Sequence, residues 1–269
     1  MRSGTRSVTA TVRRGFRRRL CSRHRRILEV RSLGCASVSR QPPVQQPPPV
    51  QRLRLRYAKR GRARFASHRD FGRAFERALR RAEIPMAFSS GFTPHPRISY
   101  VNAAPTGAAS EAEYLEIGLA QVRDPEQVRA ALNAAMPDGL VIVAVVPAAG
   151  RPLPERLSAS RWRVELPGAD PAVVSAAVTA LLSRDEASVQ RTTKNGVREV
   201  EIRGAIHEMA VTETGFELVS AIGEPTVRPD DVMSALCALE SSLSEVQGLF
   251  SRLEQGTWDG SRIVDPLAE

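Results

Sequence analysis

The sequence predicts an α+β protein made of two tandem ferredoxin-like (βαββαβ) domains behind a disordered N-terminal arm. Three observations predict this arrangement. Residues 1–50 carry twelve arginines and one acid and are rich in proline. In the remainder of the chain, segments in which apolar residues recur every second residue alternate with segments in which they recur every 3.6 residues. The order strand, helix, strand, strand, helix, strand occurs twice. We therefore expect an arm over residues 1–50, domains over 51–150 and 158–260, and a tail over 261–269.

The arm combines the arginine cluster "RRGFRRRLCSRHRR" with the proline-rich spacer "RQPPVQQPPPVQR". Such a spacer favours polyproline II, and neither segment has the apolar residues needed for a core. Three interpretations stay open. The arm is a solvated extension with or without a binding role, a segment of transit-peptide composition, or the product of an over-extended start codon.

The first domain begins with a strand, because Leu53, Leu55 and Tyr57 alternate with arginines at period two. The segment "SHRDFGRAFERALRRAEI" then predicts a helix. Ser67 is its expected N-cap, and Asp70 completes a pair resembling a capping box. An apolar stripe follows at helical spacing, and a proline ends the helix.

Strands near residues 97–102 and 113–119, a helix with an Asp-Pro start over "DPEQVRAALNAAMPDG", and the buried strand "LVIVAVV" complete this domain. The second domain repeats the order. Its helices are "DPAVVSAAVTALLSRDEA" and "RPDDVMSALCALESSL", and "VQGLFSRLEQG" supplies its last strand. Within it, "RTTKNGVRE" predicts a hairpin turn.

Several classes of protein are excluded by composition. No apolar run reaches the roughly 18 residues of a membrane span, so we expect no membrane association. Cys21, Cys35 and Cys237 are far apart and odd in number. They predict neither a disulfide framework nor a zinc site, and they favour a reducing cytoplasm. Phosphate-loop, GxGxxG and CxxxCxxC patterns are all absent, so we expect no metal and no cofactor.

Charge is distributed unevenly along the chain. The formal net charge is +11 over residues 1–50, +10 over 51–100 and −11 over 101–269. This asymmetry predicts a polyanion or a charged protein as partner. Arginine suits phosphate, and exposed aromatic rings suit unpaired bases, so RNA is the expected polyanion. The alternative is that these arginines form only a solvated helix face. The predicted nucleic-acid-binding residues are Lys59, Arg60, Arg62, Arg64, Arg73, Arg77, Arg81, Arg97 and Phe92.

Four residues are candidates for catalysis: His68, Asp70, His95 and Glu113. His68 and Asp70 lie in the first turn of the predicted helix, where backbone N–H groups favour anions. Their alternative role is helix capping. His95 lies between two prolines, so it is either a fixed base or a loop anchor. A helix of about 17 residues spans about 25 Å, which would separate the two histidines unless the loop folds back.

The motifs of this region resemble the radical-SAM-linked domain of unknown function, in its stand-alone actinobacterial form. The resemblance rests on four runs: KxGxxRFxSHxD from Lys59 to Asp70, RAxxRAxxP, SxGFxPHP around His95, and GxxSxxEY around Glu113. Arg69 departs from the pattern, where an aliphatic residue is usual. The resemblance implies an association with radical SAM chemistry and with RNA metabolism, but no particular reaction.

Three functions therefore compete. The first is an accessory protein of a radical SAM enzyme or an RNA-processing protein, which binds RNA through the basic face of the first domain. The second is an RNA-modifying or RNA-cleaving enzyme that uses His68, Asp70 and His95, a possibility that rests on fold analogy. The third is a scaffold that contacts only proteins. Convergence of the four candidate residues in one pocket would favour the enzyme.

Overall fold

A computed structural model describes residues 45–193 and 196–268 of the chain. Most of the predicted arm lies outside these residues. Its last part, however, already packs on the fold. The Val50 amide donates a hydrogen bond of 2.8 Å to the Leu119 carbonyl, and the Gln46 amide donates one of 2.9 Å to the Ser90 hydroxyl. The folded region therefore includes residues N-terminal to the predicted boundary at residue 51.

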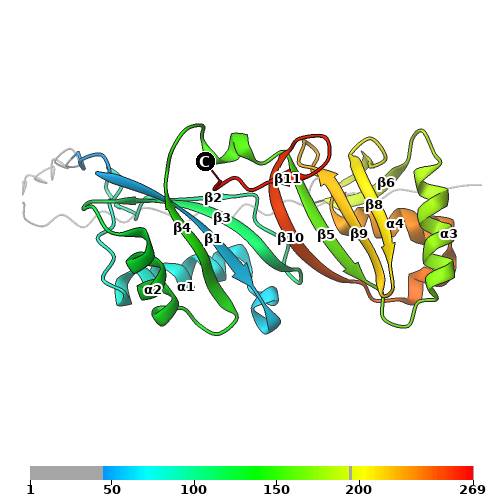
Figure 1. Ribbon diagram of the computed structural model, residues 1–269, viewed down its shortest axis with the longest axis horizontal. Coiled ribbons are helices and arrows are strands. Elements are labelled where there is room, and N and C mark those ends of the chain that lie inside the picture. The colour runs from blue at the N-terminus through cyan, green and yellow to red at the C-terminus, as the bar shows by residue number, and fades with distance from the viewer. Residues whose placement is uncertain (1–44, 194–195, 269) are drawn as a thin grey trace, which may run out of the picture. The chain divides into compact units, whose positions relative to one another are not determined.

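The predicted α+β class is confirmed. The described residues contain a nine-stranded mixed sheet, a separate two-stranded hairpin and four α-helices. The main path of the sheet is β4-β1-β3-β10-β5-β9-β8, with β2 paired to β3 and β11 paired to β10 (Figure 1). Of the helices in the described residues, none is long and apolar enough to cross a membrane.

The first half of the described chain, residues 45–150, follows the predicted element order. It consists of β1 (Gln51–Lys59), the short 3-10 helix η1 (Gly61–Phe65), α1 (His68–Arg81), β2 (Ile98–Val101), β3 (Ala109–Leu119), α2 (Pro125–Ala135) and β4 (Leu140–Pro147). Its strands are ordered β4-β1-β3-β2, all antiparallel. Both helices cover one face of these strands (Figure 1), where Phe71 and Phe75 of α1 are fully buried against Leu55 and Leu115.

The second half, residues 157–268, begins with β5 (Ala159–Glu165) and α3 (Pro171–Leu182). The hairpin β6 (Ser188–Thr193) and β7 (Gly196–Glu201) follows; its predicted Lys-Asn turn lies outside the described residues. The remaining elements are β8 (Ile206–Thr212), β9 (Gly215–Ala221), α4 (Pro229–Leu239), the 3-10 helix η3 (Ser241–Glu245), β10 (Leu249–Trp258) and β11 (Ile263–Val264). Here the strand order is β10-β5-β9-β8.

One parallel contact joins the two halves into a single sheet. Ala109 pairs with Ser251 and Ser110 with Arg252, so the start of β3 lies beside the first half of β10 (Figure 1). The described residues accordingly form one compact unit. The boundary predicted between the halves carries the 3-10 helix η2 (Leu153–Arg156).

The connection between the halves covers the face of the first-half strands opposite α1 and α2. Leu153 and Leu157 pack there against Ala112 and Tyr114. Arg54, which the alternation of β1 places on this face, is only 4% exposed. Arg54 is therefore closed to solvent by the connecting segment, to which it donates a hydrogen bond at the Arg151 carbonyl, whereas Arg52 stays exposed and lies 3.5 Å from Glu116.

Candidate nucleic-acid interface

Helix α1 presents a row of arginines to solvent. Its buried residues form one stripe that faces the sheet, and the helix begins at Ser67, whose hydroxyl accepts the Asp70 amide at 3.2 Å. Four arginines recur at every fourth position on the exposed side. We call this set the arginine face: Arg69, Arg73, Arg77 and Arg81. A helix rises 1.5 Å per residue, so neighbouring members are about 6 Å apart along its axis.

The arginine face has no close acidic partner in the described residues, although the charge of Asp70 acts on Arg69 and Arg73 from a greater distance. Within 4.0 Å, none of its four guanidinium groups has a carboxylate among the described residues, whereas the neighbouring Arg80 lies 4.0 Å from Glu76. By contrast, Arg60 of the predicted set is bound in a two-bond pair by Glu111, at 2.7 and 2.5 Å. Its charge is therefore compensated within the protein. On α1, by contrast, four guanidinium groups without a carboxylate within 4.0 Å lie on one side of a single helix.

The turn before α1 adds an exposed aromatic ring. Phe65, the last residue of η1, is 59% exposed, and the Arg64 guanidinium lies 4.8 Å from its ring centre. Arg62 in the same turn is also exposed. An arginine beside an exposed ring is an arrangement that both phosphate and base can use.

A proline-rich loop, residues 88–97, follows α1, and internal hydrogen bonds fix its shape. Ser89 makes two of them: its amide donates to the His95 carbonyl at 2.8 Å, and its hydroxyl accepts the His95 amide at 3.0 Å. Arg97 donates from Nε to the Phe88 carbonyl at 3.1 Å. The tip exposes Phe92, which is 69% accessible. We call this segment the proline loop.

A cavity of about 400 Å³ lies between the proline loop and α1. Apolar side chains, among them Leu79, Met86 and Phe88, line most of it. Glu76, Arg80 and His95 provide polar groups. The cavity thus connects the predicted loop residue His95 to the C-terminal half of the helix that carries the arginine face.

The other candidate catalytic residues do not line this cavity. His68 is exposed, with its ring edge against Tyr100 at a centroid distance of 4.7 Å. Asp70 accepts the Ser67 hydroxyl at 2.7 Å, and this bond chiefly holds the pKa of Asp70 below its ordinary value. His68 and Asp70 thus lie at the start of α1, while His95 lies beside its C-terminal half.

Glu113, the fourth candidate, belongs to a buried ionic cluster. It is 1% exposed; its Oε2 accepts the Ala104 amide at 2.9 Å, and Oε1 lies 3.3 Å from Arg252 Nη1. Arg252 also donates to the Asn102 carbonyl at 2.7 Å and lies over the Trp162 ring at 4.6 Å. Glu113 therefore links β3 to β10.

Lys59 does not lie on the basic face, contrary to the prediction. Lys59, Ser110 and Arg252 are register partners across β1, β3 and β10, and this row is covered. Lys59 is 4% exposed, and burial lowers its pKa while Glu113 opposes that effect. We call Lys59, Glu113 and Arg252 the ionic seam. The pairing of β3 with β10, which the sequence did not predict, is the reason for the burial of Lys59.

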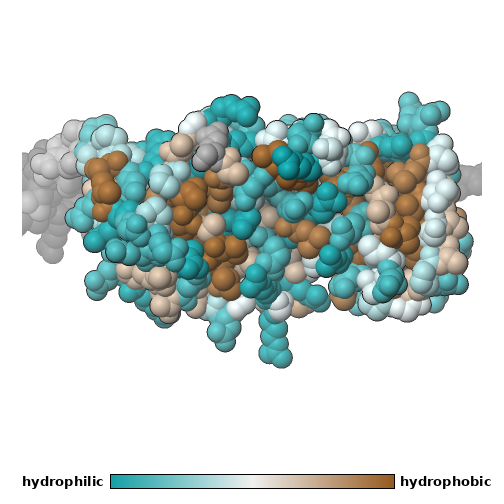
Figure 2. Space-filling model, viewed as in Figure 1, coloured by the Kyte–Doolittle hydropathy of each residue, from teal (hydrophilic) through white to brown (hydrophobic). Residues whose placement is uncertain are grey.

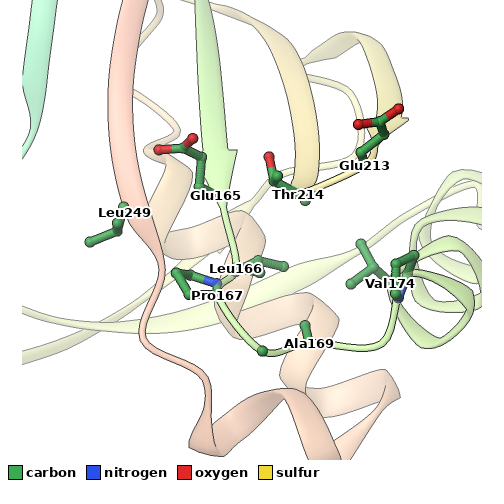
Figure 3. A pocket seen from close by; sticks show the side chains of 11 residues that line it. Glu165, Leu166, Pro167, Ala169, Val174, Glu213, Thr214 and Leu249 are labelled. Atoms are coloured by element: carbon green, nitrogen blue, oxygen red, sulfur yellow. The ribbon is translucent and has the colours of Figure 1, made fainter.

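A second cavity, of about 300 Å³, lies in the other half, at the end of β5 and the start of α3. Figure 3 shows its apolar side chains, including Leu166, Val174 and Leu249, together with the carboxylates of Glu165 and Glu213. Carboxylates repel phosphate, so this cavity does not suit a polyanion. On the face shown in Figure 2, apolar residues occur as separate patches among hydrophilic ones.

Six of the nine predicted nucleic-acid-binding residues are accessible to solvent, and the arginines among them have no carboxylate within 4.0 Å in the described part of the chain. Arg62, Arg64, Arg73, Arg77, Arg81 and Phe92 are at least partly exposed. Half-buried Arg97 serves the loop instead. The predicted set omitted Arg69, Phe65 and Phe88. The four-residue spacing from Arg73 to Arg81 could have indicated Arg69, but no sequence signal shows that Phe65 and Phe88 stay exposed.

Residues 52–229 match the model of a family described as "Uncharacterized protein conserved in bacteria (DUF2344)". No curated protein matches the chain. Among solved structures, it is similar to a crystal structure of a protein proposed to be a glycine cleavage system transcriptional repressor. That match has 9% identity over 74% of this chain and 95% of the other, with a TM-score of 0.18, which carries no argument about fold or function.

The family match includes α1 with its arginine face, and the proline loop. Of the ionic seam it includes Lys59 and Glu113 but not Arg252. Its description names no radical SAM enzyme and no RNA. Because the match covers well over half of the sequence, the chain belongs to the DUF2344 family of uncharacterised conserved bacterial proteins.

Proposed function

We propose that the protein binds single-stranded RNA through the arginine face of α1. The observation that carries this proposal is that Arg69, Arg73, Arg77 and Arg81 form a solvent-facing row without an ion-pair partner within 4.0 Å among the described residues. Guanidinium groups bind phosphate oxygens in a bidentate geometry. The row is about 18 Å long, which allows contacts with several successive phosphates.

A salt titration of RNA binding tests this proposal. Each phosphate contact with a single strand contributes about −0.7 to the slope of log K against log salt. In the full-length protein, the double variant Arg73→Gln/Arg77→Gln should therefore lower the magnitude of the slope by about 1.4. Both proteins carry the same N-terminal arginines, so the contribution of residues 1–50 cancels in this difference. Fluorescence anisotropy with a labelled RNA 12-mer measures both slopes.

The matched control is Arg184→Gln/Arg198→Gln, which removes two exposed arginines from the second half. Its slope should equal that of the wild type. An unchanged slope in the α1 variant, or an equal decrease in both variants, would contradict the proposal. Absence of RNA binding at low salt would contradict it as well.

We also propose that residues 51–150 and 158–260 are two ferredoxin-like units. The support is that both halves share one strand order. With the β6–β7 hairpin treated as an insertion, each of the two units has four strands. Numbered in chain order within each unit, these strands lie in the order 4-1-3-2 across the sheet, as β4-β1-β3-β2 and as β10-β5-β9-β8. An experimental structure with another strand order in either half would refute this.

The sequence motifs alone support the proposal that the protein acts in the cytoplasm as an accessory of a radical SAM enzyme or an RNA-processing protein. Affinity purification from the native cell followed by mass spectrometry tests it. Recovery of such an enzyme in a stable ratio is expected. Recovery of RNA without either enzyme would leave RNA binding standing and remove the accessory role.

A further inference from the structure

We infer that the cavity between the proline loop and α1 holds one unpaired base of the bound RNA. This inference rests on the proposed function, because the arginine face would place the RNA strand beside the cavity. Arg80 connects the two sites. It lines the cavity and lies between Arg77 and Arg81 in sequence, within one turn of the helix.

The cavity has the composition of a base pocket. Leu79 and Met86 give it an apolar surface, and Phe88, which is 43% exposed, offers a ring on which a base can stack. The volume of about 400 Å³ lies within the range of small-ligand sites. A base is flat, apolar on its faces and polar at its edge, so it matches this combination of a ring with a few polar groups.

The cavity also has polar groups that can pair with the edge of a base. The Glu76 carboxylate accepts hydrogen bonds, and the His95 imidazole can donate or accept one. Base amino and imino groups donate, while ring nitrogens and carbonyls accept. Glu76 lies 4.0 Å from Arg80, so its oxygens are only loosely held by that guanidinium.

The construction of the proline loop fits this role. Both bonds between Ser89 and His95 are made through the His95 backbone, so they fix the residue, which lines the cavity, without using its imidazole. A loop that only linked α1 to β2 would not need to place Phe88 and His95 on the same cavity. Fixed groups lose less entropy on binding than mobile ones do.

The test compares two RNA 12-mers with equal numbers of phosphates, one with bases and one abasic, bound to the full-length protein. Stacking of one base should make the base-containing strand bind about ten-fold more tightly. Phe88→Ala should reduce that preference to nearly one. Val211→Ala, which shortens an exposed apolar side chain in the second half, is the control and should keep the preference.

A second measurement protects the test against a folding defect in Phe88→Ala. A strand with 2-aminopurine should change its fluorescence on binding to the wild type, and this change should be smaller with His95→Ala. Equal affinities of the wild type for both strands would overturn the base pocket but leave the arginine face standing. Binding of neither strand would overturn both. A base preference that survives Phe88→Ala would place the base elsewhere and overturn this inference.

Discussion

The ionic seam and the arginine face both contain arginine, but the environments of these side chains are opposite. In the seam, the side chains of Glu113 and Arg252 are 1% and 3% exposed and bound to each other and to backbone groups. The four arginines of the arginine face are exposed and have no carboxylate within 4.0 Å in the described part of the chain. Charge in the first region links two halves of a sheet, and charge in the second is available to a partner.

This difference shows that a basic residue in a motif-rich segment need not have a binding role. Lys59 and Arg60 are adjacent in one basic run, yet Lys59 is buried and Arg60 is paired with Glu111. Burial makes the loss of one partner costly, since it leaves an uncompensated charge in a medium of low polarity. At an exposed site, loss of one charged partner changes the free energy of unfolding only slightly.

The largest expected effect is in the seam. Arg252→Met should lower the free energy of unfolding by about 3–5 kcal/mol, because Glu113 then stays buried without its closest charged partner. Urea denaturation followed by circular dichroism measures this change. The double variant Glu113→Gln/Arg252→Met should lose less than the sum of the two single variants. Arg163→Met, on the neighbouring strand β5, removes an exposed arginine and serves as control.

The second prediction concerns alkaline pH. All three tyrosines are partly or fully buried, and burial raises the pKa of Tyr100 to about 12 and those of Tyr57 and Tyr114 well above their ordinary value. In the unfolded chain they ionise near pH 10. The stability they contribute is therefore complete below pH 10 and is lost as the pH rises above it.

Absorbance near 295 nm should show little tyrosinate in the folded protein at pH 11, and urea unfolding should need less denaturant at pH 11 than at pH 9. Lys59 acts in the opposite sense, since its lowered pKa makes its contribution rise with pH until about 10.4. The net loss should thus begin only above pH 10. Full tyrosine ionisation at pH 10 in the folded state would refute the burial of these groups.

The third prediction separates the role of the Ser67 cap in the stability of α1 from the proposed role of the arginine face in RNA binding. Ser67→Ala should destabilise the protein by about 1 kcal/mol, because the hydroxyl no longer caps the Asp70 amide. RNA affinity should stay the same, as Ser67 lies outside the arginine face. Ser67→Thr, which keeps the hydroxyl, should recover most of the loss. An RNA-binding defect without destabilisation would instead favour a direct role of the Ser67–Asp70 pair.

The smallest expected effect on stability is in the arginine face. Arg73→Gln/Arg77→Gln should change the free energy of unfolding by no more than about 0.5 kcal/mol per residue, although it weakens RNA binding. Thermal unfolding at low and moderate salt measures this. If the variant is more stable than the wild type, repulsion among the arginines lowers the free energy of unfolding by more than the packing of their alkyl chains raises it. A loss as large as that of Arg252→Met would remove the distinction between the two regions.

Much of the first half followed from local sequence. The apolar stripe of α1, its Ser67 cap and the element order β1-α1-β2-β3-α2-β4 all depend on residues within one or two turns or on period-two alternation. The arginine face was predicted in part because helical spacing determines which residues share a side. The proline loop was singled out by its composition, but its cavity was not, since the cavity needs α1 and the loop together.

The sequence by itself determined the order of helices and strands in the first half, which stripe of α1 is buried and where positive charge accumulates. Only the tertiary structure decided which charges are accessible. Arg252 is 139 residues from Glu113, and the parallel pairing of β3 with β10 brings them together. Local periodicity reports the side to which a residue points, whereas burial depends on what covers that side. For Lys59 and Arg54, the cover comes from segments far away in the chain.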